Sequence, residues 1–173
     1  MYFAPLRGVS RMDSLNIILS YSDQTFSDAE KEVMAEEKNE LYREYLQKMT
    51  PKDVSDDTRV LLEKLRERGL KLAIGSSSKN TQLILEKTDM AKYFHAVSDG
   101  NNITKSKPHP EVFLKAAEYL NLPPCECIVV EDAEAGIDAG NAGGFATVGI
   151  GCAENYNKTK YPIKSLAELL KLV

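Results

Sequence analysis

The chain has 173 residues, of which 43% are hydrophobic, with a formal net charge of −4 and an isoelectric point of about 5.3. This length predicts one domain with a real core and room for a small insert. Lysine and arginine are scattered along the sequence, which argues against nucleic acid and anionic membranes as partners. No apolar run approaches the roughly 20 residues of a membrane span, and the start is too poor in apolar residues for a signal peptide. We therefore expect a cytoplasmic protein.

The three cysteines are Cys125, Cys127 and Cys152, two of them in a C-x-C pattern before an apolar run. No second Cys/His pair lies at a spacing typical of zinc sites. We expect reduced thiols rather than a metal site or a disulfide framework.

The first third of the chain has helical patterns and no strand pattern. Ser10 is followed by Asp13 and by apolar residues at helical spacing, which predicts a capped helix. The capping box S-D-A-E at residues 27–30 predicts a second helix that extends to about residue 47. A polar, proline-containing breaker follows at residues 49–57. We expect a partial helical cap domain at residues 1–50 and an α/β core domain at residues 51–173.

From residue 58 onward, helical and strand patterns alternate. Helices are predicted at residues 58–68, 81–87, 111–120 and 165–170. Strands are predicted at residues 70–74, 94–98, 128–130 and 145–150. This alternation predicts an α/β fold with a Rossmann-like parallel sheet of about four strands. In such sheets, ligands bind outside the carboxyl ends of the strands.

Three loops fall at those strand ends. Residues 75–80 carry three serines before a helix, which suits either an anion site or an ordinary serine-rich helix cap. Lys107 is either a solvated loop lysine or a basic ligand, and Glu131 and Asp132 are either solvated acids or ligands of a cation. A phosphate needs donors and positive charge, whereas Mg²⁺ prefers carboxylate oxygens. The three loops together therefore predict a site for a phosphate with Mg²⁺.

Four segments in this order carry a specific resemblance to a known family. They are L-R-G-V-S-R-M-D-S-L at residues 6–15, I-G-S-S-S-K-N at 74–80, S-K-P-H-P at 106–110 and V-V-E-D-A-E-A-G-I at 129–137. With them, and over almost its whole length, the chain resembles the haloacid dehalogenase superfamily and, within it, the β-phosphoglucomutase family. The resemblance implies a Rossmann-like core domain with a small helical cap.

The resemblance also implies a role for individual residues. Ser76, Ser77 and Lys107 match the residues that bind the transferring phosphate. Glu131 and Asp132 match the acids that hold Mg²⁺. The implied substrate is a small sugar phosphate, and the residues implied to bind it are Arg11, Lys38, Asn39, Ser78, Lys79 and Asn80.

The chain departs from the family pattern in one major respect. The family has a strand ending in D-x-D, whose first aspartate is the nucleophile and whose second is the general acid and base, and no D-x-D occurs in this sequence. In the family this strand is central, between the strands that end here at Ser76 and Glu131. We therefore expect two unmatched strand edges and an open slot in the core. Smaller departures are Asp56-Asp57 in place of a Pro-Gly hinge and Ala133 in place of a frequent serine.

The function implied by the resemblance is a Mg²⁺-dependent interconversion of β-glucose 1-phosphate and glucose 6-phosphate through an aspartyl phosphate. Because the nucleophile is missing, we expect the chain to be inactive alone. One alternative is a small-molecule phosphatase of the same superfamily. Another is a truncated, non-catalytic remnant or a sugar-phosphate-binding protein. We expect a monomer if the chain is complete, and self-association through exposed strand edges if it is truncated.

Overall fold

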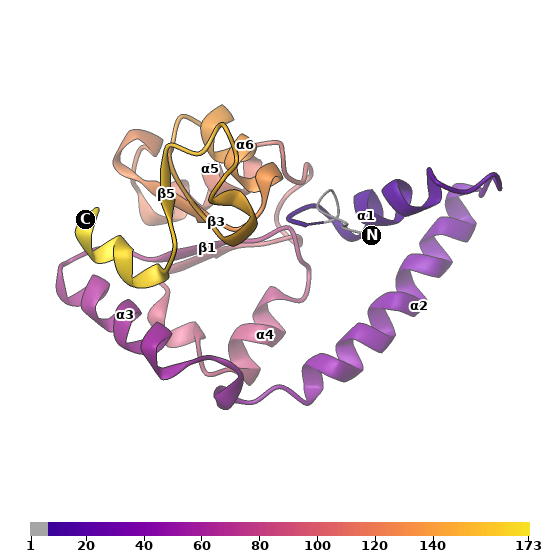
Figure 1. Ribbon diagram of the computed structural model, residues 1–173. Helices are drawn as coiled ribbons and strands as arrows, with labels where there is room; N and C mark the ends of the chain where they lie inside the picture. The colour runs from indigo at the N-terminus through magenta and orange to yellow at the C-terminus, as the bar shows by residue number, and fades with distance from the viewer. Residues whose placement is uncertain (1–6) are drawn as a thin grey trace.

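Two helices extend from the core as an arm. The structure is a computed structural model that describes residues 7–173, so the start of the chain and Leu6 of the segment at residues 6–15 lie outside it. Helix α1 (Arg11–Leu19) and the longer α2 (Asp28–Gln47) form the arm seen on the right of Figure 1. Both predicted caps are present, because Ser10 and Ser27 accept hydrogen bonds from backbone amides three residues later.

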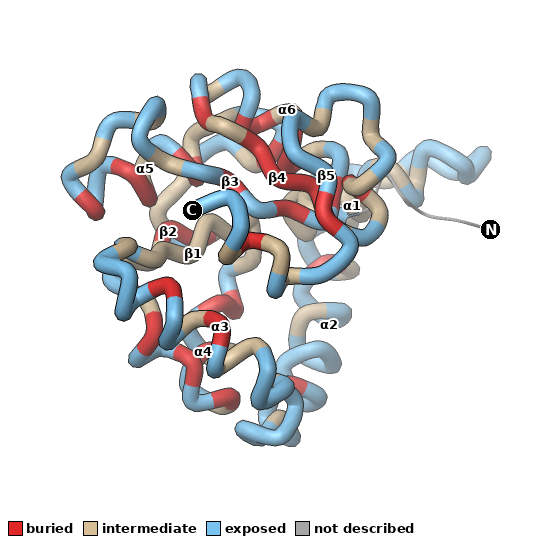
Figure 2. Tube along the Cα trace, turned by 60° about the vertical axis from the view of Figure 1, so that its left-hand side comes forward, coloured by how far each residue is buried: buried red, intermediate tan, exposed pale blue. Residues whose placement is uncertain are grey.

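The arm is mostly exposed. Ala35 and Leu46 are the buried side chains of α2, whereas Val33, Leu41 and Tyr45 are exposed. Figure 2 shows the contrast with the core, where buried residues concentrate on the strands and the helices beside them. The arm therefore has little core of its own and depends on polar contacts with the rest of the chain.

The core alternates helices and strands, as the sequence predicts. Its regular elements are α3 (Asp56–Glu67), β1 (Ala73–Gly75), α4 (Thr81–Lys87), β2 (Ala96–Ser98), α5 (Glu111–Leu120), β3 (Ile128–Glu131), α6 (Glu134–Ala142), β4 (Ala146–Ile150) and β5 (Tyr161–Ile163). Five short 3₁₀ segments connect or follow them: η2 (Pro51–Asp53), η3 (Ala91–Tyr93), η4 (Pro124–Glu126), η5 (Gly151–Ala153) and η6 (Leu166–Lys171). The segment predicted as the last helix is therefore a 3₁₀ helix.

The strands form two parallel sheets rather than one. The first has the order β1-β2 and the second has the order β3-β4-β5. The parallel α/β class is confirmed, but the expected single sheet of about four strands is wrong. Strand β1 pairs with β2 alone, and β3 pairs with β4 alone, so no strand pairing joins the two sheets within residues 7–173. Within residues 7–173 each sheet has two edge strands, β1 and β2 in the first and β3 and β5 in the second, and the unmatched edges of β1 and β3 agree with the expected open slot.

Helices cover the strands on two sides. Helices α5 and α6 lie above the strands in Figure 1, and α3 and α4 lie below them. The upper layer packs Phe113 of α5 edge-on against Phe145, with ring centroids 6.2 Å apart. The lower layer packs Leu61 and Leu65 of α3 against Val148 of β4. The strands thus lie between two apolar layers, as expected for parallel strands.

Two further expectations concern membrane spans and cysteines. No helix in residues 7–173 is long and apolar enough to cross a membrane. Cys125, Cys127 and Cys152 form no disulfide within residues 7–173 and are reduced thiols.

Candidate functional site

Lys107 is buried where strands β1 and β3 end. Its Nζ atom donates to the carbonyl oxygen of Gly75 at 3.1 Å and to the Oε1 atom of Glu131, and it lies 4.6 Å from the ring centroid of Phe113. The side chains of Lys107 and Glu131 are only 5% and 9% exposed. Lys107 is therefore no solvated loop lysine but one partner of a buried ion pair, which solvent and salt screen little.

The two adjacent acids have different surroundings. Successive strand residues point to opposite sides, so Glu131 turns inward to Lys107 while the Asp132 side chain is 65% exposed. The Oδ2 atom of Asp132 lies 3.8 Å from Nη1 of Arg7. Residues 7–173 contain no cluster of three or more potential metal-ligating side chains. The assignment of both acids to Mg²⁺ stays a prediction.

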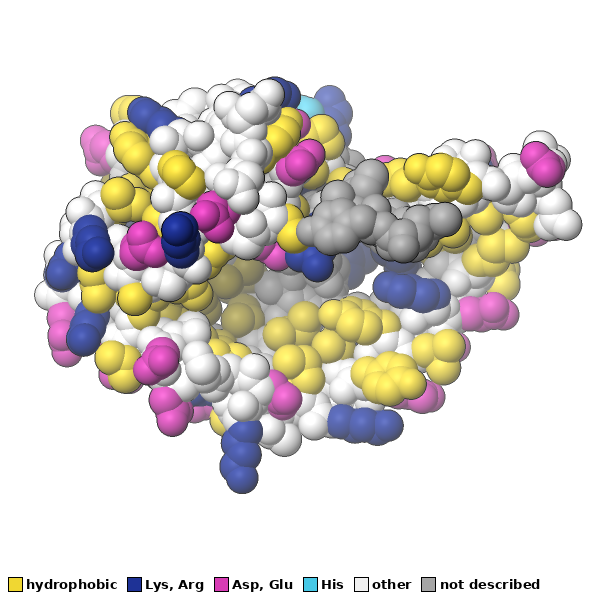
Figure 3. All heavy atoms as spheres, viewed as in Figure 1, with side chains coloured by type: hydrophobic (Ala, Val, Ile, Leu, Met, Phe, Trp, Pro, Cys, Tyr) yellow, Lys and Arg dark blue, Asp and Glu magenta, His cyan; other side chains and the backbone are white. Residues whose placement is uncertain are grey.

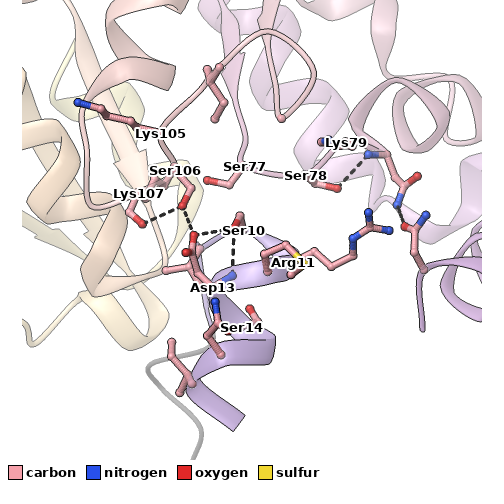
Figure 4. A pocket seen from close by; sticks show the side chains of 18 of the residues that line it. Ser10, Arg11, Asp13, Ser14, Ser77, Ser78, Lys79, Lys105, Ser106 and Lys107 are labelled. Carbon is pink, nitrogen blue, oxygen red and sulfur yellow. Dashed lines mark hydrogen bonds between the residues drawn. The ribbon is translucent and has the colours of Figure 1, made fainter. Parts of the chain in front are cut away.

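A cavity of about 1000 Å³ lies between the arm and the core. It brings together side chains of α1, α2 and the loops after β1 and β2 (Figure 4). The predicted site residues that line it are Arg11, Lys38, Asn39, Ser77, Ser78, Lys79, Asn80 and Lys107. Ser76, Glu131 and Asp132 lie outside this lining. The cavity thus unites the predicted substrate residues with the predicted phosphate lysine.

The serine loop after β1 is closed by its own hydrogen bonds. The Oγ atom of Ser76 accepts from the amide of Ser78 at 3.2 Å, and Oγ of Ser78 accepts from the amide of Asn80 at 3.1 Å. These two amides are therefore used within the loop. The hydroxyl of Ser78, which lines the cavity, keeps its own hydrogen, which can be donated to a ligand there.

A polar network joins the arm to the serine loop. Arg11 donates to Glu36 at 2.8 Å, and Asn39 donates to the other oxygen of Glu36 at 3.2 Å. Asn80 of the loop then donates to Asn39 at 2.9 Å. Glu36 was not predicted as a site residue, although it lies one helical turn before Asn39 on the same helix. The network positions Arg11 beside the cavity.

Asp13 makes a second link between the arm and the core. Its Oδ2 atom accepts from Ser10 Oγ at 2.5 Å and from Ser106 Oγ, the neighbour of Lys107 (Figure 4). Partial burial raises the pKa of Asp13, but hydrogen bonds from Ser10 and Ser106 outweigh it, so that the pKa lies below its ordinary value. The sequence indicated Asp13 only as part of a helix start. In the structure this carboxylate holds α1 against the Lys107 loop.

Glu111 fixes another part of the cavity wall. It accepts from the amide and hydroxyl of Thr104 at 3.0 and 2.9 Å and from the amide of Lys105 at 2.8 Å. The Thr104 amide is the main cause that lowers the pKa of Glu111 to about 2. A lowered pKa contributes stability that is fully present above the unfolded-state value of 4.5 and is lost as the pH falls toward 2.

We therefore expect Glu111→Gln to lower the urea midpoint at pH 7 and to have progressively less effect between pH 4.5 and pH 2. Urea denaturation at a series of pH values measures this difference. Glu118→Gln, an exposed change on the same helix, is the control and should leave the midpoint unchanged. A difference for Glu111→Gln that stays constant down to pH 2 would contradict the role of the charge.

Known proteins of one family are similar to this chain. The family model for haloacid dehalogenase-like hydrolases matches residues 5–144. A β-phosphoglucomutase of Bacillus subtilis is 37% identical over 148 residues, which cover 84% of this chain and 66% of that protein. A phosphorylated carbohydrates phosphatase of Thermotoga maritima is 28% identical over 120 residues, which cover 68% of this chain and 53% of that protein.

Among solved structures, a β-phosphoglucomutase from Clostridium difficile superposes with a TM-score of 0.88 at 37% identity. The match covers 96% of this chain and 75% of that one. The chain spans less than two thirds of the length of the curated relatives above, at 66% and 53%. Because the family model matches most of its residues, the chain belongs to the haloacid dehalogenase-like hydrolase family.

Proposed function

We propose that this chain is a phosphoryl-transfer protein of the β-phosphoglucomutase type, whose cavity binds a small sugar phosphate. The observation that carries the proposal is the buried Lys107, which opens on a cavity lined by serine hydroxyls and basic side chains. The similar proteins from Bacillus subtilis and Clostridium difficile, both β-phosphoglucomutases, support the same reaction class.

Lys107 is suited to hold the transferring phosphate. An ammonium group has three donors, and those of Lys107 are directed to Gly75 and Glu131 with one remaining. The hydroxyl of Ser77, which donates to the carbonyl oxygen of Gly8 at 3.1 Å, lines the same cavity as Lys107. Because Glu131 already balances the positive charge of Lys107, the phosphate is recognised mainly by directed hydrogen bonds.

The arm is suited to hold the other end of the substrate. Arg11 and Lys38 line the cavity from α1 and α2, opposite the Lys107 loop. A planar guanidinium binds a phosphate with two parallel hydrogen bonds. Arg11 can turn from Glu36 to a phosphate, since this ion pair is partly exposed and exposed pairs contribute little stability.

The donor chemistry at the end of β3 fits Mg²⁺. Mg²⁺ commonly binds one or two carboxylates, a substrate phosphate and several waters. The exposed carboxylate of Asp132 can supply one such carboxylate. Asp132 would bind the ion, and the neighbouring Glu131 would remain paired with Lys107. Bound Mg²⁺ would neutralise the charge of the transferring group.

Turnover needs a nucleophile that this sequence does not supply as D-x-D. Phosphoryl transfer through a covalent intermediate requires an oxygen in line with the phosphorus, and its removal typically costs about 10⁶ in rate. We therefore expect the 173-residue chain to bind ligands without measurable turnover.

Binding is tested by calorimetry with glucose 6-phosphate and with inorganic phosphate, each with Mg²⁺. Arg11→Ala should weaken the binding of glucose 6-phosphate by about tenfold or more, because a charge-assisted hydrogen bond contributes about 1.5–3 kcal/mol. The affinity for inorganic phosphate should stay nearly unchanged. Lys64→Ala, an exposed change on α3, is the control. Equal weakening of both ligands would contradict the placement of Arg11.

The second candidate is a phosphatase, which the relative from Thermotoga maritima favours. The two activities can be distinguished in a fusion protein that has a strand ending in D-x-D joined to the N-terminus of the chain. The fusion is assayed with β-glucose 1-phosphate, a bisphosphate primer and Mg²⁺. Formation of glucose 6-phosphate supports the mutase. Release of phosphate without isomerisation supports the phosphatase, and a fusion that binds the sugar phosphate without either reaction leaves a binding protein.

A further inference from the structure

We propose that Asp13 is a specificity-determining residue, whose carboxylate accepts a hydrogen bond from a hydroxyl group of the sugar phosphate in the cavity. The inference rests on the proposed function and adds which part of the ligand this residue recognises. Asp13 lines the cavity from the first turn of α1, and it is hydrogen-bonded to Ser106 in the loop that carries Lys107.

The wall of the cavity is basic. Among residues 7–173, five basic side chains line it: Arg11, Lys38, Lys79, Lys105 and Lys107. Figure 3 shows lysine and arginine side chains where the arm meets the core. In the same part of the chain, Asp13 is the one acidic residue of the lining. The cavity therefore has a single carboxylate within a wall that attracts anions.

The charge of Asp13 decides which part of a ligand can lie beside it. The pKa of Asp13 lies below its ordinary value, so the carboxylate is ionised at pH 7. A negative charge repels the phosphate that the surrounding cations attract. The part of the ligand that contacts Asp13 is therefore neutral, and it must donate a hydrogen bond, because an ionised carboxylate only accepts. A sugar hydroxyl has both properties.

One oxygen of the carboxylate is available to a ligand. Its Oδ2 atom accepts from Ser10 Oγ and from Ser106 Oγ (Figure 4). Its Oδ1 atom accepts no hydrogen bond from the residues that the structure describes. The two serines fix the orientation of the carboxylate, so Oδ1 is a preorganised acceptor whose orientation does not have to be found when the ligand binds.

The start of α1 has different functions on its two sides. Arg11 is bound to Glu36 of α2, at 2.8 Å, whereas Asp13 is bound to Ser106 of the core. Residues two apart on a helix do not face each other. The first turn of α1 thus offers a cation on the arm side and an acceptor on the side of Lys107. The recognised hydroxyl lies at the end of the sugar that is nearer to Lys107.

This arrangement favours a phosphate ester with many hydroxyl groups. A site that is built to bind a hydroxyl rejects an analogue that lacks it, because the acceptor then loses water without gaining a partner. Inorganic phosphate has no sugar hydroxyl and gains nothing from Asp13. Asp13 therefore favours sugar phosphates over phosphate esters that have no hydroxyl at this place.

The probes are glucose 6-phosphate and its analogues that lack the hydroxyl at carbon 1, 2, 3 or 4. Each is titrated by calorimetry, with Mg²⁺, into the 173-residue chain. We expect at least one analogue to bind about tenfold or more weakly than glucose 6-phosphate, because a hydrogen bond to a charged group is lost.

Asp13→Asn tests whether Asp13 recognises this hydroxyl. The amide has the same shape, and its oxygen must face the two serine donors, so its NH₂ group takes the place of Oδ1. The preference for glucose 6-phosphate over that analogue should fall by about threefold or more, because the charged acceptor is gone. Asp23→Asn, an exposed change outside the cavity lining, removes the same charge and should keep the preference.

A second measurement needs no variant. The carboxyl carbon of Asp13 in the unchanged chain should shift in its NMR signal when glucose 6-phosphate saturates the site, and it should shift less with the analogue that binds weakly. Melting curves show whether Asp13→Asn and Asp23→Asn are folded before they are titrated.

Two results would overturn the inference and leave glucose 6-phosphate binding, and with it the proposed function, in place. One is equal affinity of the chain for glucose 6-phosphate and all the analogues. The other is a loss of affinity in Asp13→Asn that is the same for every ligand, the result for a residue that only holds α1 against the Lys107 loop. Absence of glucose 6-phosphate binding to the unchanged chain would overturn both the proposed function and the inference.

Discussion

Replacement of Lys107 by methionine should lower the free energy of unfolding by about 3–5 kcal/mol, because Glu131 is left as a buried carboxylate without its cation. The side chains of both residues are less than a tenth exposed, so water cannot replace the lost partner. Urea denaturation of the wild type and of Lys107→Met at pH 7 measures the change. A loss below about 1 kcal/mol would be the value for an exposed pair and would contradict the burial of this one.

The double variant Lys107→Met/Glu131→Gln is the control for this prediction. It removes both charges and keeps side chains of similar size, so we expect it to recover most of the lost stability. The four proteins form a double-mutant cycle that isolates the coupling between Lys107 and Glu131. If the double variant is as unstable as Lys107→Met, packing rather than charge causes the loss.

Gly75→Ala should destabilise the end of β1 by about 1–3 kcal/mol, the usual cost of an overpacked core. A Cβ atom at Gly75 would lie 2.6 and 2.8 Å from two carbons of the Phe113 ring. This ring is buried and lies under Nζ of Lys107, so its displacement should also weaken phosphate binding. Denaturation and phosphate calorimetry measure the two effects.

The second change Phe113→Leu tests the cause of the Gly75 effect. A smaller side chain at this position gives room to the new methyl group, so Gly75→Ala should cost less in the Phe113→Leu background than in the wild type. If the cost is the same in both backgrounds, then contact with the ring is not its cause.

The sequence predicted elements whose signals are local. The bounds of α4 and α5 match the prediction, because helical spacing and a preceding Pro110 mark α5 directly. The buried residues of α5 are Val112, Phe113, Ala116, Ala117 and Leu120. Strand β5 was missed, since three residues that include Pro162 carry no strand pattern. The open slot between β1 and β3 was expected from the family resemblance alone, because pairing between distant segments leaves no local pattern.

The site was predicted in its parts but not in its contacts. The serine loop and Lys107 were found because small hydroxyl residues and a lysine at strand ends suit a phosphate. Lys107 and Glu131 were assigned to different ligands, yet they bind each other across 24 positions of the chain. The link between Asp13 and Ser106 spans 93 positions. Contacts of this kind arise from tertiary packing and leave no spacing pattern in the sequence.

The claim that Lys107 forms a phosphate site at the meeting point of two strands can be tested directly. Calorimetry should titrate glucose 6-phosphate with Mg²⁺ into the wild type and into Lys107→Met/Glu131→Gln, after melting curves have shown that both are folded. We expect saturable binding to the wild type and a loss of about tenfold or more in affinity for the double variant, because the directed donors of the ammonium group are gone. Equal affinity of the two proteins would contradict the placement of the phosphate at Lys107.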